Sequence, residues 1–187
     1  MGESGPSKRS DAELIAAFLS GDAEGFGGIV DRYGGRVFNF IRRYLGHEED
    51  ARDVFQETFL AAMRALVHFD ATRPLLPWLL GIAFNRCREE RRRRRPGRLD
   101  ESGAGEPMSS DPGPGGRAEM REEVERVVRA VGALDDAHRA VFLLRVYDGF
   151  KYSEIGEILN ISEGTAKSRM HYAVYNVRKF MQALDEA

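Results

Sequence analysis

Apolar side chains recur every three or four positions through most of residues 11–95, a spacing that predicts amphipathic α-helices rather than strands. Breaks at Ser20-Gly21-Asp22 and at Gly46, together with Pro74, divide this stretch into four helices, the third over about 48–67. The buried stripe of the first helix is expected to contain Leu14, Ile15, Phe18 and Leu19. That of the third helix is expected to contain Val54, Phe55, Phe59, Ala62, Met63 and Leu66.

The second helix carries an intrinsic weakness. Its apolar stripe is interrupted by glycines, each of which costs a helix interior about 1 kcal/mol relative to alanine. Packing against the rest of the protein, or against a partner, must therefore hold it. These glycines are Gly25, Gly27, Gly28, Gly34 and Gly35.

Residues 96–117 separate this helical stretch from a second one. They are rich in Gly, Pro, Ser and acidic residues and have no apolar period, which predicts a flexible linker. Residues 1–10 are polar and lack the apolar stretch of a secretion signal, so we expect a disordered tail and a cytoplasmic protein. No segment has the length and apolarity of a membrane span, and membrane insertion is not expected.

The second helical stretch, residues 118–187, begins with an amphipathic helix whose stripe is Val124, Val127, Val128 and Val131. A further helix closes at Gly149. Two more helices then follow in close succession. Ser153 is the expected N-cap of the first, Asn160 suits the left-handed residue that ends it, and Ser162 suits the N-cap of the second.

This last pair of helices, Tyr152 to Phe180, has the pattern of a helix-turn-helix. Ala166, Met170 and Ala173 form an inward stripe on the second helix, and polar and basic side chains face outward from its first turns. Such a helix fits the major groove, with base contacts near its N-terminus and phosphate held by amides and cations. The alternative is a helical hairpin used only for packing. The residues expected to face outward are Lys167, Ser168, His171, Tyr172 and Tyr175, and Gly164 and Thr165 are expected to face phosphate at the helix start.

The charge pattern supports surfaces of opposite sign. The net charge is only −2, but basic residues gather between Arg86 and Arg98 while acidic residues gather at 48–53 and 119–125. Because salt screens charges beyond about 10 Å, the local distribution matters more than the total. The basic surface would suit phosphates and the acidic one a basic protein partner, unless both are merely solvated helix faces. The one cysteine, Cys87, excludes an internal disulfide and a cysteine zinc cluster, and is expected to be a buried thiol.

Three segments together resemble the extracytoplasmic-function sigma factors of the sigma-70 family. They are Asp50-Ala51-Arg52-Asp53-Val54-Phe55-Gln56-Glu57-Thr58-Phe59, Trp78-Leu79-Leu80-Gly81-Ile82-Ala83-Phe84-Asn85 and Gly164-Thr165-Ala166-Lys167-Ser168-Arg169. The order and spacing match the family over nearly all of residues 11–184. The resemblance implies an all-α fold of two small helical domains, region 2-like over 11–95 and region 4-like over 118–187, joined by the linker.

The resemblance also implies the roles of the candidate residues. The first domain would bind the clamp helices of the largest subunit of core RNA polymerase through Asp53, Gln56 and Glu57, and the second would sit at the flap. The second domain would read the minus-35 element of promoter DNA through Gly164, Thr165, Lys167, Ser168, Arg169, His171 and Tyr172. The segment from Phe69 to Arg93 would recognise and open the minus-10 element, with Asn85 at a pocket for an unstacked base.

Physical reasoning supports the minus-10 role, because stacking side chains and basic grooves hold melted single strands. The residues of that kind are Phe69, Arg86, Arg88, Arg91 and Arg92, with Trp78 assigned instead to the core. Family members commonly act in stress responses and are held inactive by an anti-sigma factor, so such a partner is expected here.

Two other function classes compete with this interpretation. A helix-turn-helix regulator that binds operators without polymerase would leave the acidic face of residues 53–57 unexplained, and binding to core polymerase would separate the two. An enzyme is the second alternative. The histidines at 47, 68, 138 and 171 lack ligand spacing, and no phosphate loop or nucleophile motif is present, so no catalytic residue, cofactor or metal is expected.

Overall fold

The computed structural model describes residues 9–94 and 118–186, without the side chains of 118–122 and 185. The expected tail and linker lie outside these residues, apart from Arg9 and Ser10. The described residues form α-helices and one short 3-10 turn, which confirms the all-α prediction. The elements are α1 (Asp11–Leu19), α2 (Ala23–Leu45), α3 (Glu48–Ala65), the turn η1 (Leu66–His68), α4 (Leu75–Arg94), α5 (Ala118–Gly132), α6 (Asp136–Val146), α7 (Tyr152–Leu159) and α8 (Glu163–Asp185).

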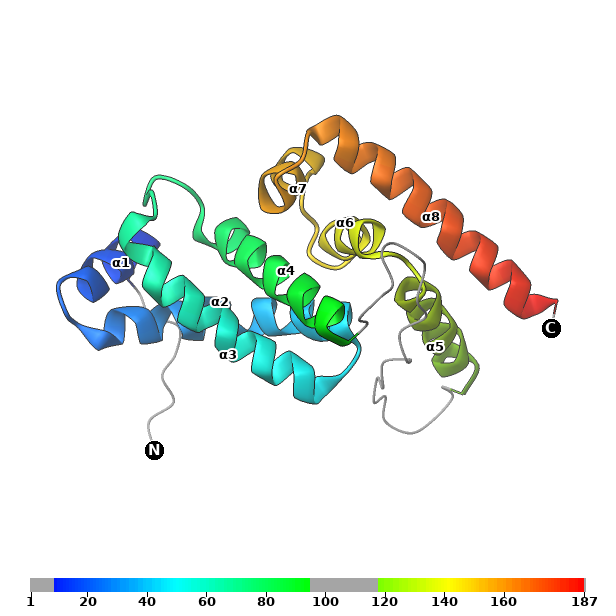
Figure 1. The fold of residues 1–187 in the computed structure, drawn as a ribbon, viewed down its shortest axis with the longest axis horizontal. Coiled ribbons are helices and arrows are strands. Elements are labelled where there is room, and N and C mark those ends of the chain that lie inside the picture. The colour runs from blue at the N-terminus through cyan, green and yellow to red at the C-terminus, as the bar shows by residue number, and fades with distance from the viewer. Residues whose placement is uncertain (1–8, 95–117, 187) are drawn as a thin grey trace.

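Helices α1 to α4 form the first domain, in which α2, α3 and α4 pack side by side and α1 covers one end of α2 (Figure 1). The core between them is made of fully buried side chains such as Phe40 and Tyr44 of α2, Val54 of α3 and Leu79 of α4. Aromatic rings continue this core, since Tyr44 and Phe84 meet edge to face at 6.0 Å between ring centroids. The three long helices thereby hold α3 and α4 in a fixed relation, with one face of each turned outward.

One of the glycines in α2 is required by the approach of α1. A β-carbon added at Gly25 would lie 2.5 Å from the Leu14 carbonyl oxygen and the Phe18 nitrogen, so the main chains of α1 and α2 can touch there only because the side chain is missing. A β-carbon at Gly28 would lie 2.7 Å from a methyl group of the flexible Leu14 side chain. Gly27 and Gly35, in contrast, meet nothing within 4 Å, so their cost is not offset by packing.

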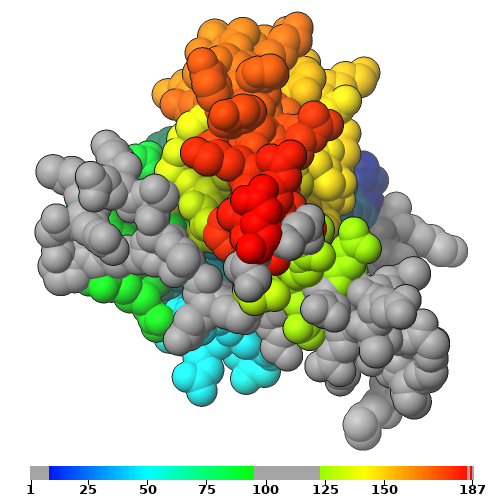
Figure 2. Space-filling view, turned by 90° about the vertical axis from the view of Figure 1, so that its right-hand side faces the viewer, coloured from blue at the N-terminus to red at the C-terminus, as the bar shows by residue number. Residues whose placement is uncertain are grey.

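Helices α5 to α8 form the second domain, in which α8 crosses both α5 and α6 (Figure 1). Viewed from one end, the orange and red residues of α8 lie above the yellow-green residues of α5 and α6 (Figure 2). Buried residues of α6 and α7, including Leu143, Leu144 and Ile155, fill the centre. This packing leaves the outer side of α8 uncovered by the other described helices.

The two domains are in direct contact, which the sequence did not predict. Helix α7 packs on α4 and α6 packs on α2 (Figure 1). A β-carbon added at Gly81 of α4 would lie 3.1 Å from the carbonyl oxygen of Ile158 in α7. The side chain of Arg139 in α6 is 2% exposed and donates to the carbonyl of Tyr44 in α2 at 2.9 Å.

Several predictions at single positions were wrong. Leu19, Met63 and Val124 were assigned to buried stripes, but their side chains are 51%, 37% and 43% exposed. Leu19 and Val124 lie at the ends of their stripes, and Met63 lies at the edge of its stripe, since the later Leu66 is buried. The N-cap of α7 is Lys151 rather than Ser153, because the Glu154 carboxylate accepts a hydrogen bond from the Lys151 amide at 2.7 Å and starts the helix earlier.

Candidate promoter and polymerase interfaces

The turn between α7 and α8 is built by close main-chain contact. Asn160 ends α7 in the left-handed conformation, with φ 53° and ψ 51°, as the sequence predicted. The Ile161 amide donates to the Gly156 carbonyl at 2.9 Å, and a β-carbon at Gly156 would lie 2.7 Å from the Ile161 carbonyl oxygen. The tight turn therefore depends on a glycine at 156 as well as on Asn160.

Ser162 caps α8, also as predicted. Its hydroxyl oxygen accepts a hydrogen bond from the Thr165 amide at 3.0 Å. The first turn also contains Gly164, where an added β-carbon would meet only the Ser162 oxygen, at 3.8 Å. The helix thus begins with an accessible backbone end, at which the helix dipole favours an anion.

The outward side of α8 carries most of the residues assigned to minus-35 DNA. Ala166 and Ala173 are fully buried and fix the rotation of the helix. Thr165 and Arg169 are half-buried, and Lys167 forms an ion pair with Glu163 at 2.6 Å on the same face. The exposed members of the set are Gly164, Lys167, Ser168, His171 and Tyr172.

An acidic and apolar ridge follows the outer face of α3. Asp53 and Gln56 are exposed and Glu57 is half-buried, so the residues assigned to polymerase share one face. Leu60 and Met63 of α3 and Val67 of the turn η1 continue this face and are 48%, 37% and 60% exposed. The exposure of these three apolar residues was not predicted, although their spacing from Asp53 is visible in the sequence. We call these six residues the α3 ridge.

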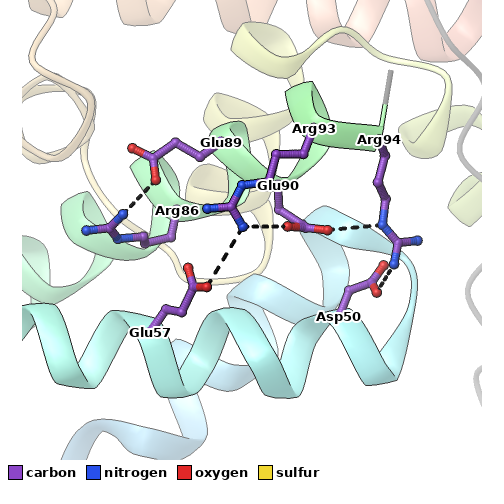
Figure 3. Close-up of polar contacts among 7 residues, drawn as sticks. All are labelled: Asp50, Glu57, Arg86, Glu89, Glu90, Arg93 and Arg94. Atoms are coloured by element: carbon purple, nitrogen blue, oxygen red, sulfur yellow. Dashed lines mark hydrogen bonds and ion pairs between the residues drawn. The ribbon is translucent and has the colours of Figure 1, made fainter. Parts of the chain in front are cut away.

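The arginines at the C-terminal end of α4 lie beside acidic groups rather than apart from them (Figure 3). Arg93 lies 3.9 Å from Glu57 of the α3 ridge and 3.3 Å from Glu90. Arg94 pairs with Glu90 at 3.1 Å and with Asp50, while Arg86 pairs with Glu89 at 2.6 Å. The basic and acidic surfaces that the sequence separates are therefore adjacent in space.

Phe69 and Trp78 frame the loop that precedes α4. Their ring centroids lie 4.7 Å apart, and both rings are half-buried. Within the loop the Asp70 carboxylate accepts hydrogen bonds from the Thr72 hydroxyl at 2.7 Å and the Thr72 amide at 3.0 Å. These hydrogen bonds lower the pKa of Asp70. Trp78 packs against the core, as expected. Asn85 is exposed and follows Trp78 by seven residues, so the two lie on the same face of α4 about two turns apart.

Arg91 is the residue assigned to DNA that the structure places elsewhere. Its side chain is 14% exposed, pairs with Asp136 of α6 at 2.9 Å and lies over the ring of Tyr44 at 5.8 Å. Arg92, the next residue, is exposed. Arg91 therefore lies at the contact between the two domains in this structure.

Cys87 is fully buried, as expected, and burial raises the pKa of its thiol well above the ordinary value, so the thiol stays protonated. Within the described residues there is no group of three or more histidine, cysteine, aspartate or glutamate side chains placed to hold a metal ion. None of the described helices is long and apolar enough to cross a membrane.

The fold and these surfaces define a two-domain helical protein with a DNA-reading helix-turn-helix in its second domain. Comparisons with known families agree: Sigma-70 region 2 matches residues 29–96, and Sigma-70 region 4 matches residues 125–175. The sigma factor CnrH of Cupriavidus metallidurans is 31% identical over 95% of this chain and 97% of its own length. SigW of Bacillus subtilis is 31% identical over 91% of this chain and 96% of its own length. SigL of Mycobacterium tuberculosis is 34% identical over 83% of this chain and 88% of its own length.

A solved structure of CnrH with the cytosolic domain of CnrY is similar to this fold, with a TM-score of 0.70, 29% identity and coverage of 92% of this chain and 97% of that one. The RpoE–NepR complex from Bartonella quintana, at 20% identity and a TM-score of 0.65, has the same fold. This chain belongs to the extracytoplasmic-function sigma factors of the sigma-70 family. It is an initiation factor rather than an enzyme, and it binds core RNA polymerase and directs it to promoter DNA.

Proposed function

We propose that three surfaces divide the work of this sigma factor. The outward side of α8 reads the minus-35 element, the loop before α4 and the outer side of α4 hold the opened minus-10 element, and the α3 ridge binds the polymerase clamp helices. The observation that carries the proposal is the exposure of the motif residues Asp53, Asn85 and Lys167 on three different helices. We propose the domain limits 11–95 and 118–187, joined by 96–117.

For the minus-35 element we propose that Lys167, Ser168, His171 and Tyr172 face the major groove, while Gly164, Thr165 and Arg169 hold the adjacent phosphates. The free backbone end of α8 supports this, because amides at a helix N-terminus bind phosphate and position the helix. Lys167 would exchange its partner Glu163 for DNA. An exposed ion pair is weak, so the exchange costs little.

Run-off transcription with core polymerase tests this assignment. Lys167→Ala or Ser168→Ala should weaken use of a cognate promoter by about 1–3 kcal/mol if the residue contacts a base. Gln182→Ala is the matched control, because Gln182 is exposed on the same helix far from its N-terminus. Equal transcription by both reading-face variants and the control would remove Lys167 and Ser168 from the interface.

For the minus-10 element we propose that Phe69, Asn85, Arg86, Arg88 and Arg92 hold the non-template strand, with Arg91 added when the domains separate. The half-buried aromatic pair before α4 and the exposed Asn85, Arg88 and Arg92 farther along α4 support this, since single strands bind by stacking and by charge. Binding should be salt-sensitive for the same reason. Substitution of Asn85 by alanine should reduce opening of a promoter more than binding of its closed duplex, as followed by permanganate reactivity.

The α3 ridge supports polymerase docking through both halves of its surface. Acidic side chains would give electrostatic attraction to a basic partner, and the exposed Leu60 and Met63 would supply apolar area at the centre of the contact. We further propose that an anti-sigma factor binds and restrains the protein; the similar sigma factor CnrH has been solved in complex with the cytosolic domain of CnrY, which supports a protein partner of this kind. The place of action is the cytoplasm, where promoters and polymerase meet.

A further inference from the structure

The contact between the two domains holds one cation away from DNA. Arg91 belongs to the basic run of α4, yet its side chain is 14% exposed, whereas those of Arg93 and Arg94 are 61% and 52% exposed. Its partner, Asp136, lies in the first turn of α6. Each domain thus contributes one member of this ion pair.

The Arg91–Asp136 ion pair leaves part of the guanidinium without a hydrogen-bond partner among the described residues. Arg91 Nη1 is buried and has no hydrogen-bond acceptor among the described residues. A buried donor without an acceptor is costly, and a guanidinium that reaches water or a phosphate recovers that cost. Other groups also cross the domain contact, among them Arg139, whose guanidinium donates to the carbonyl of Tyr44 in α2 and to three carbonyls of its own domain.

The closed arrangement does not allow both promoter elements to be read at once. Gly81 of α4 lies against Ile158, and the four residue steps from Ile158 to Ser162 span at most about 15 Å. Helix α4 and the start of α8 are therefore within about 20 Å of each other. The minus-10 and minus-35 elements are by name about 25 base pairs apart, which is about 85 Å of B-form DNA. The domains must part before both can bind.

We propose that Arg91 is a switch residue that Asp136 holds in the closed arrangement and that binds the phosphate backbone at the minus-10 element once the domains separate. Separation of the domains then exposes the Arg91 guanidinium for DNA binding. The same step lets α4 and α8 reach the minus-10 and minus-35 elements together. This inference rests on the function proposed above for α4.

Two variants open the contact by independent routes. Asp136→Asn removes the charge that holds Arg91 and leaves the N-cap residue Asp135 in place. Gly81→Leu inserts a side chain where only the Ile158 carbonyl lies within 4 Å of the added β-carbon, so it drives α4 and α7 apart without a change of charge. Asp31→Asn is the charge control, because Asp31 is exposed on the outer side of α2.

The first readout is the separation of the domains in the full-length protein without polymerase. Dyes on Asn39→Cys and Gln182→Cys report it by energy transfer, because both positions are exposed and the native thiol of Cys87 is buried. Both opening variants should lower the transfer efficiency, and Asp31→Asn should not. Unchanged efficiency in both opening variants would overturn the proposal, because the pair and the close approach would then not hold the domains.

The second readout is the affinity of the same variants for a fluorescent single-stranded DNA oligonucleotide without polymerase. Asp136→Asn and Gly81→Leu should each bind about three- to tenfold more tightly than the native chain, a gain within the range of one released phosphate contact. The gain should disappear when Arg91→Ala is added to either variant. Tighter binding that survives Arg91→Ala, or open domains with native affinity, would overturn the role of Arg91.

Transcription separates this inference from the proposed function on which it rests. With core polymerase, Asp136→Asn should initiate as well as the native chain, because polymerase opens both. If the Asn85 and Arg88 variants opened the minus-10 element as well as the native chain, the function proposed for α4 would fail. A gain in oligonucleotide affinity dependent on Arg91 would then still show the switch itself.

Discussion

Arg139 of α6 connects the C-terminal ends of α5 and α2, and its removal is the sharpest test of how the two domains are held. The guanidinium donates to the carbonyls of Val131 at 3.2 Å, Leu134 at 3.0 Å and Tyr44 at 2.9 Å, and also to that of Gly132. Val131 and Gly132 end α5, and Tyr44 lies in the last turn of α2. Carbonyls at a helix C-terminus lack intrahelical partners and carry partial negative charge, so a cation there is doubly favourable.

The cost of Arg139→Leu follows from these contacts. Hydrogen bonds that involve a charged group are each worth about 1.5–3 kcal/mol, and removal of the donor also leaves buried acceptors without partners. Gly132 is half-buried and can turn to water, so the four contacts do not add fully. We expect a loss of about 3–5 kcal/mol, similar to the cost of breaking a buried ion pair.

Urea unfolding followed by two signals measures this loss. Fluorescence of Trp78 reports on the first domain, and far-ultraviolet circular dichroism reports on all helices. Arg139→Leu should lower the midpoint of the dichroism transition and separate it from that of Trp78, because the second domain loses the cap of α5 and its tie to α2. Arg129→Ala is the control, since Arg129 is exposed on α5. Stability within about 0.5 kcal/mol of the native chain would refute the reasoning.

Three further predictions follow from local structure. Gly27→Ala should stabilise the protein by about 0.5–1 kcal/mol, because no atom lies within 4 Å of the added β-carbon. Gly25→Ala should destabilise it, because the added β-carbon would push α1 away from α2. Thermal unfolding should therefore show a raised midpoint for the first variant and a lowered one for the second. Burial opposes ionisation of Asp135, but hydrogen bonds from the His138 and Ala137 amides and the His138 ring outweigh it and lower its pKa. The pKa of Asp135 is lower in the folded than in the unfolded chain, so its ionised form stabilises the fold above pH 3.8, and this stabilisation is lost as the pH falls through the folded pKa. In Asp135→Ala, the free energy of unfolding should therefore fall less steeply with pH over this acidic range. Leu60→Ser should weaken binding to core polymerase by about 1 kcal/mol or more in a competition assay without loss of helix content, because Leu60 is 48% exposed.

Local chemistry explains which features the sequence predicted correctly. Asn160 and Ser162 were assigned from their own side chains, and both act within three residues of their position in the chain. Such short-range hydrogen bonds depend little on the rest of the fold. The start of α7 shows the limit of this rule, since Ser153 was expected as the N-cap but the Glu154 carboxylate accepts from the Lys151 amide and makes Lys151 the N-cap.

Contacts between distant segments explain what the sequence did not predict. The period of α3 identifies its faces, but only the positions of α2 and α4 decide how wide the buried face is, and Met63 lies outside it. The glycines of α2 were identified as a weakness, yet Gly25 is explained only by the backbone of α1. Arg91 is one of a run of similar arginines, and nothing local separates it from Arg92. Its partner lies in the other domain.

Footprinting on a cognate promoter tests the central claim most directly. The claim is that this sigma factor reads two separated promoter elements, with polymerase holding its domains apart. With core polymerase, the native chain should protect both elements, and Lys167→Ala should reduce protection of the minus-35 element first. Without polymerase, protection should be weak at both. Strong protection of a single site by the protein alone, unchanged when core polymerase is added, would contradict the account and favour an operator-binding regulator.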